Sequence, residues 1–170
     1  IAYRDKVVAD FYRTVQEIAS SIHSNLLVTA NFGTSLVFGG NLSAPGTSPF
    51  VLADAGGLAF GLTEDWSNCQ YTRQFCSYMC DVYRAAMERN GRAFGMMSIL
   101  TSPPEITAKA FSEVGHGAAA LSLFCYGPHW LSGDNCNLNA AHYPAIRRFC
   151  ETTAAVEDVL VGSRVAKGDA

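Results

Sequence analysis

The sequence predicts an α/β protein in which helices alternate with parallel strands along the chain. Three observations carry this prediction. Short apolar segments recur between longer segments of helical spacing, the junctions are short, and Gly, Asn or Pro marks most segment ends. Because each helix returns the chain to the starting end of the sheet, strands connected in this way pair in parallel.

The composition is that of one compact domain covering residues 1–170. Of the 170 residues, 49% are hydrophobic and 16% are charged, a balance that can bury one sizeable core. The net charge is -3 and the densest basic segment is Arg147-Arg148, so nucleic acid is not an expected partner. The longest apolar run, Ala118 to Tyr126, is far shorter than the about 20 residues of a membrane span, so no membrane partner is expected.

The sequence opens on Ile1, directly in helical pattern and with no targeting segment ahead of it. We expect that processing or truncation removed an upstream part. Localisation therefore stays open between cytoplasmic and secreted.

The first third of the chain predicts one helix, one strand and a long loop. Tyr3 to Ile22 has apolar residues at three- and four-residue spacing, which predicts an amphipathic helix. Residues 26–30 are mostly apolar and end at Asn31, which is typical of a strand buried on both faces. Residues 33–56 are rich in Gly and Pro and predict a loop, with one helical turn near Val51 to Asp54.

The rest of the chain predicts three βα units. Strands are expected at 58–63, 93–100 and 118–125, and helices at about 70–89, 103–114 and 143–161. Asn90-Gly91 supplies a left-handed stop for the first of these helices, and Pro103-Pro104 opens the second.

The cysteines and histidines indicate no metal or cofactor. The six cysteines include no CxxC pair, and Cys76 and Cys80 lie one turn apart on one predicted helix, where a disulfide bond is not expected. His129, Cys136 and His142 match no zinc spacing. Neither GxGxxG nor GxxxxGK occurs, so those routes to nucleotide binding are not indicated.

Polar and aromatic side chains gather at the carboxyl ends of the predicted strands, where parallel α/β folds bind ligands. Aromatic rings pack on the flat faces of sugars, carboxylates and amides bind their hydroxyls, and glycosidic cleavage needs an acid and a base. We therefore expect a carbohydrate site. The candidate catalytic residues are Glu64 and Asp65, and the candidate substrate-binding residues are Asn31, Trp66, Tyr126, His129 and Trp130.

Each of these residues also has a purely structural interpretation. Glu64 and Asp65 could cap the helix that follows them, because acids favour helix N-termini. Their adjacency on a strand points the two side chains apart, so they are not expected to form one acid/base pair. Trp66 and Trp130 could close the top of the fold instead of stacking on a sugar.

Three segments resemble the later strands of (β/α)8 glycoside hydrolases, in particular the β-galactosidase-like enzymes of the large retaining clan. The segments are NLLVTANFG, LAFGLTEDWSN and AAALSLFCYGPHW. The resemblance implies that the chain is the C-terminal part of a TIM barrel, with its four strands as strands five to eight. In that clan the acid/base Glu follows strand four and the nucleophile Glu ends strand seven, where RAFGMMSILTS carries no carboxylate.

The resemblance leaves two alternatives for the function. The chain is either a divergent glycoside hydrolase that uses Glu64 or Asp65, or a noncatalytic carbohydrate-binding or scaffold half-barrel. The same βα order also permits an open-sheet, flavodoxin-like domain. A half-barrel exposes two strand edges, so the expected partner besides carbohydrate is an N-terminal half-barrel or a homo-oligomer.

Overall fold

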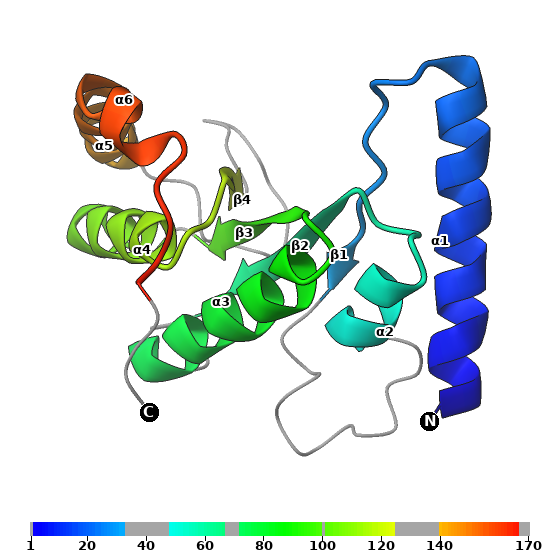
Figure 1. Cartoon of the computed structure of the whole chain (residues 1–170). Helices are drawn as coiled ribbons and strands as arrows, with labels where there is room; N and C mark the ends of the chain where they lie inside the picture. Colours follow the sequence, from blue (N-terminus) through cyan, green and yellow to red (C-terminus); the bar gives the residue numbers. More distant parts are fainter. Residues whose placement is uncertain (1, 33–47, 67–71, 100, 125–139, 167–170) are drawn as a thin grey trace.

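The structure is a computed structural model, and it describes residues 2–32, 48–66, 72–99, 101–124 and 140–166. Helices and strands alternate along the chain, so the predicted parallel α/β fold is confirmed (Figure 1). The elements are α1 (Ala2–Ile22), β1 (Asn31–Phe32), α2 (Pro49–Asp54), β2 (Phe60–Asp65), α3 (Arg73–Glu88), β3 (Ala93–Ile99), α4 (Pro103–Gly115), β4 (Ala120–Phe124), α5 (His142–Ala155) and α6 (Glu157–Leu160).

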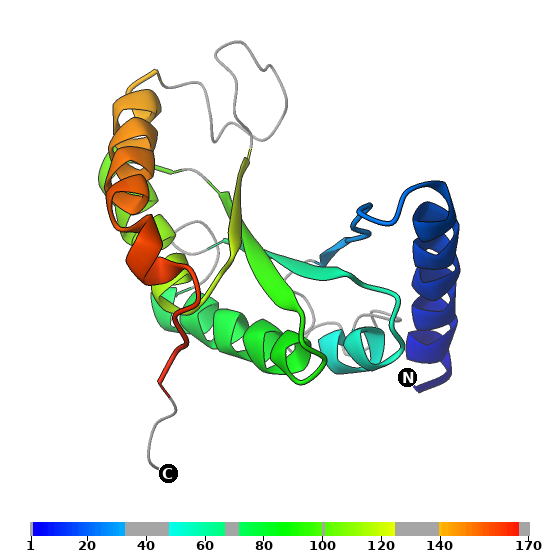
Figure 2. The same ribbon diagram turned by 45° about the horizontal axis from the view of Figure 1, so that its top comes forward.

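The four strands form one parallel sheet in the order β1-β2-β3-β4. Each strand therefore lies beside the strand that precedes it in the sequence. The described helices follow an arc along one face of the sheet, which we call the helix face (Figure 2). The described residues place no helix on the opposite face, which we call the open face. Its side chains come from Asn31, Phe60, Leu62, Glu64, Ala93, Met97, Ile99, Ala120, Ser122 and Phe124.

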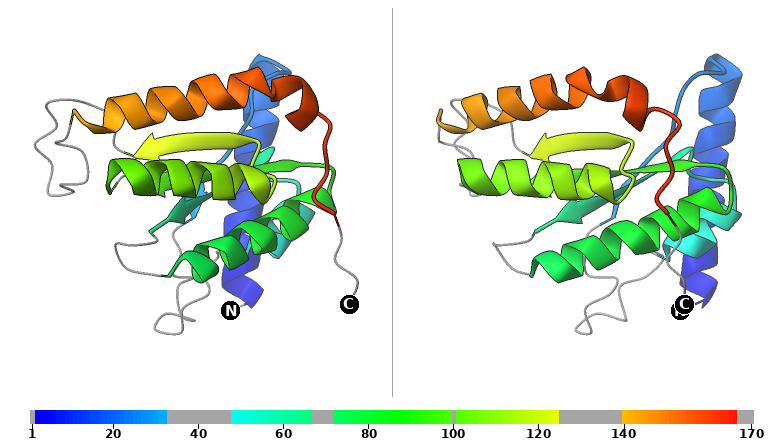
Figure 3. Two further views of the ribbon diagram at one scale, coloured as in Figure 1. Left: turned by 90° about the vertical axis from the view of Figure 1, so that its left-hand side faces the viewer. Right: turned by 60° about the vertical axis from the view of Figure 1, so that its left-hand side comes forward.

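The hydrophobic core lies on the helix face. Apolar side chains of α2 and α3 pack there against β2 and β3, and the largest are fully buried, namely Leu52, Met79, Tyr83, Met87, Phe94 and Met96. A smaller cluster joins α4 to α5 through Ile106 and Ile146, with Leu123 of β4 packed against it. Figure 3 shows α3, α4 and α5 arranged one after another along this side of the sheet. The described helices cover one face only. Side chains on the other face, including those near the carboxyl ends of the strands, are therefore not covered by a described helix.

Helix α3 begins and ends at recognisable signals. The Thr72 hydroxyl accepts a hydrogen bond from the Phe75 amide (3.3 Å), which satisfies one of the free donors of the first turn. At the other end Gly91 has a φ of 66°, a left-handed conformation that glycine adopts without a Cβ clash. The predicted stop at Asn90-Gly91 is confirmed, and the helix is shorter at both ends than the predicted range of 70–89.

Helix α1 buries only part of its apolar surface. It packs through Ala9, with Val8 and Tyr12 beside it, and the Tyr12 ring lies edge-on to Phe32 at 6.1 Å between centroids. A second set of apolar side chains on α1 is 49 to 79% exposed: Tyr3, Val7, Phe11, Ile18 and Ile22. The helix was predicted correctly, but the described residues leave this stripe of α1 uncovered.

Other predicted elements also differ from the structure in their bounds; β2, for example, runs from Phe60 to Asp65 where 58–63 was expected, so it contains Glu64 and Asp65. The strand expected at 26–30 is found instead at Asn31–Phe32, beyond the predicted range. The preceding residues make one backbone bond toward the start of β2, where the Val28 carbonyl accepts from the Ala59 amide (3.0 Å). The helix expected at 143–161 is interrupted at Val156, which separates α5 from α6. Cys76 and Cys80 are buried free thiols, as predicted.

Candidate functional site

The Glu64 carboxylate is held on the open face at the carboxyl end of β2. One oxygen accepts a hydrogen bond from the side-chain amide of Asn31 (2.6 Å), and the other accepts from the Trp66 indole N–H (2.7 Å). Glu64 and Trp66 are half-buried, whereas Asn31 is exposed. Three of the predicted site residues are therefore brought together at one edge of the sheet.

Strand alternation explains why these side chains meet. Successive residues of β2 point to opposite faces, so Leu62 and Glu64 share the open face with Asn31, whose register partner is Leu62. On the helix face, the Thr63 hydroxyl donates to the Phe32 carbonyl (2.8 Å) and ties the short strand β1 to β2. The position of Asn31 beside Glu64 therefore depends on the buried Thr63–Phe32 hydrogen bond, which joins the residues next to them in sequence.

Asp65 lies on the other side of the sheet from Glu64. It is 3% exposed, and one of its carboxylate oxygens is 3.9 Å from the Lys109 ammonium. The expectation that Asp65 caps the following helix is wrong, because α3 begins at Arg73 and its cap is Thr72. The predicted divergence of Glu64 and Asp65 is confirmed, and Asp65 takes no part in the group on the open face.

Lys109 and Glu113 of α4 are functional candidates that the sequence analysis did not identify. Both are at most 3% exposed, and Lys109 donates to the Ile99 carbonyl (2.7 Å) at the end of β3. Burial, and after it the negative charge of Asp65, raise the pKa of Glu113 well above its usual value. The signal for this burial is their spacing, since residues 106, 109, 110 and 113 fall on one helical face.

The buried Cys80 thiol and Tyr83 phenol of α3 are held neutral. Burial raises the pKa of Cys80, and the negative charge shared by the neighbouring acids Glu113 and Asp65 raises it further. Burial also raises the pKa of Tyr83. Since a thiolate is the reactive form of cysteine, Cys80 is a packing residue here and not a nucleophile.

The remaining predicted site residues are not placed by the structure. Tyr126, His129 and Trp130 lie outside the described residues, as does Cys136. His142 begins α5 and is 4% exposed. Within the described ranges, no group of three or more His, Cys, Asp or Glu side chains is arranged to hold a metal ion.

Comparison of the chain with protein-family models, with curated proteins and with solved structures finds no match. The resemblance to (β/α)8 glycoside hydrolases therefore stays a prediction. No helix in the described part of the chain is long and apolar enough to cross a membrane.

Proposed function

We propose that the chain is a segment of a glycoside hydrolase-like (β/α)8 barrel that binds carbohydrate at the carboxyl ends of its strands. The observation that carries the proposal is the Glu64 carboxylate, which lies on the open face and is oriented by Asn31 and Trp66. A carboxylate with an amide and an indole beside it is the combination of groups that sugar hydroxyls and sugar ring faces require.

The strand order supports a barrel segment over an open, flavodoxin-like sheet. Doubly wound sheets have an order such as 2-1-3-4-5, in which the direction of winding reverses and helices cover both faces. Here the order is β1-β2-β3-β4 without reversal, and the described helices lie on one face. A barrel is wound in this sequential way, with its helices outside and its ligand site at the carboxyl ends of the strands.

The geometry favours recognition by Glu64 over complete catalysis by the described residues. Glycosidic cleavage uses two carboxyl groups about 5 to 9.5 Å apart. Among the described strand residues, Glu64 is the one carboxylate on the open face, because Asp65 points to the helix face. We therefore propose that Glu64 binds sugar hydroxyls, and that cleavage occurs where a completing half-barrel supplies the second carboxylate.

A second half-barrel that completes the fold would also account for the uncovered surfaces at the two ends of the sheet. In the described residues, β1 and β4 each pair with one other strand, which leaves an edge of each without a strand partner. The exposed apolar stripe of α1 lies at the β1 end. An N-terminal half-barrel or a second copy of the chain would cover these surfaces, and sedimentation velocity distinguishes them because a second copy makes a dimer.

The proposal is tested by substituting Glu64 and measuring sugar binding to the whole chain. Galactose and a panel of aryl glycosides, aryl β-galactosides among them, are the probes, with tryptophan emission or calorimetry as the readout. Glu64→Gln should weaken binding about tenfold or more, since hydrogen bonds to a charged group contribute about 1.5–3 kcal/mol. Where an aryl glycoside is hydrolysed, turnover should fall about 10²–10⁴-fold.

The matched control is Glu88→Gln, the same chemical change at the exposed last residue of α3. It should leave binding unchanged. Wild-type protein that binds no sugar, or a Glu64→Gln variant that binds as tightly as the wild type, would contradict the proposed function.

A further inference from the structure

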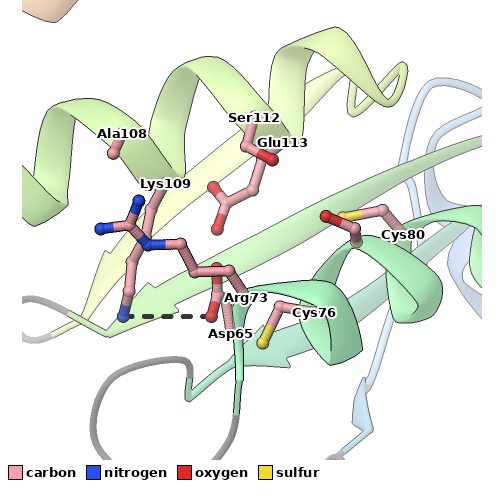
Figure 4. A pocket seen from close by; sticks show the side chains of 9 residues that line it. Asp65, Arg73, Cys76, Cys80, Ala108, Lys109, Ser112 and Glu113 are labelled. Atoms are coloured by element: carbon pink, nitrogen blue, oxygen red, sulfur yellow. Dashed lines mark ion pairs between the residues drawn. The ribbon is translucent and has the colours of Figure 1, made fainter.

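Directly behind Glu64, on the helix face, lies a group of buried charges that we call the acid cluster: Asp65, Lys109 and Glu113. A cavity of about 20 Å³, with room for about one water molecule, lies among these side chains. The Asp65 and Glu113 carboxyl groups point toward one another across it (Figure 4). Cys76 and Cys80 of α3 line the same cavity.

The charges in the acid cluster do not balance when both acids are ionised. One ammonium would then face two carboxylates, and all three side chains are at most 3% exposed. An unpaired charge in such a site is strongly destabilising. A single proton on one of the acids brings the cluster to neutrality.

Hydrogen bonding assigns that proton to Glu113. Lys109 donates to the Ile99 carbonyl and lies 3.9 Å from Asp65. As the side chains lie, neither Glu113 oxygen accepts a hydrogen bond from the described part of the chain, although Ser98 is near enough to stabilise an ionised Glu113. A protonated Glu113 can donate to Asp65, which satisfies the buried group and holds the two acids together.

We propose that Asp65 and Glu113 share one proton, and that this proton fastens the end of β2 to α4 and so keeps Glu64 directed at the open face. Asp65 and Glu113 are then positioning residues for Glu64, and loss of the proton at raised pH releases them. The inference rests on the site proposed above, but it uses the position of Glu64 and not the identity of any ligand.

Burial and the charge of Asp65 favour the protonated form of Glu113, and two other groups around it oppose them. Asp65 on β2 contributes a negative charge, Lys109 on α4 opposes it, and the Ser98 hydroxyl of β3 can hydrogen bond to the ionised acid. From α3, neutral Cys76 and Cys80 line the cavity, and Arg73 is engaged by Glu105. Burial is the largest effect, and it raises the pKa of Glu113.

The pH dependence follows from the sign of this shift. Because the pKa of Glu113 is higher in the folded state than the usual 4.5, the folded state holds its proton more tightly than the unfolded chain does. Its contribution to stability is complete below that usual value and is lost as the pH rises through the folded pKa. Glu113→Gln keeps a donor for Asp65 but cannot titrate, so it should remove this dependence.

Trp66 reports the position of Glu64 without a ligand, because its indole N–H donates to that carboxylate. Replacing the other tryptophan, by Trp130→Phe, makes Trp66 the sole indole emitter. Its emission should shift as the pH is raised from about 5 to about 10, while far-ultraviolet circular dichroism remains that of the folded chain. The same protein with Glu113→Gln should show no shift, and with Glu88→Gln it should shift like its parent.

A flat emission profile in the Trp130→Phe protein, or a shift that persists with Glu113→Gln, would overturn the proposal. If Glu113→Gln fails to fold, carbon-13 spectra of the carboxyl groups of the unsubstituted chain decide. One proton shared by Asp65 and Glu113 near neutral pH supports the inference, and two ionised acids overturn it. If the protein binds no sugar but shows the expected emission shift, the proposed function is contradicted. The inference about the acid cluster then still stands.

Discussion

Glu64 and Asp65 are neighbours in sequence with opposite surroundings. Glu64 is half-buried on the open face and accepts hydrogen bonds from an exposed amide and an indole. Asp65 is 3% exposed and faces an ammonium and a second carboxyl group. The comparison teaches that one strand end can present a carboxylate to solvent while its next residue anchors the strand. Substitutions at the two faces should therefore differ in kind.

The largest effect on stability is expected from Lys109→Met. This change removes the ammonium that lies 3.9 Å from the buried Asp65 carboxylate, and breaking a buried pair in this way costs about 3–5 kcal/mol in the free energy of unfolding. Urea unfolding at neutral pH measures it.

The matched control for this substitution is Lys6→Met. Lys6 pairs with Asp10 at 2.8 Å, but its side chain is 71% exposed, so the expected cost is about 1 kcal/mol or less. Equal costs at the two positions would show that the acid cluster behaves like a surface ion pair.

A smaller effect is expected from Asp65→Asn, which should lower the free energy of unfolding by about 2 kcal/mol. This value lies between the cost of losing a surface ion pair and the cost of leaving a buried charge unpaired. Glu113 can then ionise and pair with Lys109, which limits the cost. A capping role would instead predict about 1 kcal/mol or less, the effect of a weakened helix end. Urea unfolding beside Asp54→Asn, a change at a 47% exposed carboxylate of α2, separates the two interpretations.

The smallest effect on stability is expected from Glu64→Gln. The amide is nearly the same size, and the bonds to Asn31 and Trp66 are accessible to water, so unfolding should change by about 1 kcal/mol or less. Thermal melts of the variant should nearly overlay those of the wild type. A loss as large as that of Lys109→Met would mean that the open face also serves to hold the fold together.

Periodicity predicted the order of elements because each helix and strand leaves its own repeat in the sequence. The same reasoning failed for Lys109 and Glu113, since a Lys and a Glu four residues apart are typical of a solvated helix surface. Which face of α4 is buried depends on where α3 and the sheet lie, and that is tertiary information. Likewise, the exposed stripe of α1 follows helical spacing, yet spacing does not say what covers it.

The site was predicted in part for a similar reason. Alternation along β2 correctly separated Glu64 from Asp65, because a strand repeats every two residues. The meeting of Asn31 with Glu64 required the register of β1 against β2, which depends on the Thr63–Phe32 bond across the helix face. The cap of α3 was misjudged because several residue types that favour helix N-caps follow one another here, and the sequence does not say that Thr72 is the one used.

The sequential strand order has a consequence for how the chain can be made. Each strand pairs with the one synthesised just before it, so every new βα unit can dock on a partner that already exists as the chain leaves the ribosome. A helix separates each pair of neighbouring strands, so the paired residues are 25 to 33 positions apart in sequence. The Asp65–Lys109 pair is an exception, because the ammonium that pairs with β2 arrives three elements later, on α4. Until that helix has docked, the end of β2 bears a carboxylate in water, and the growing chain should acquire its final strand geometry only when α4 is complete.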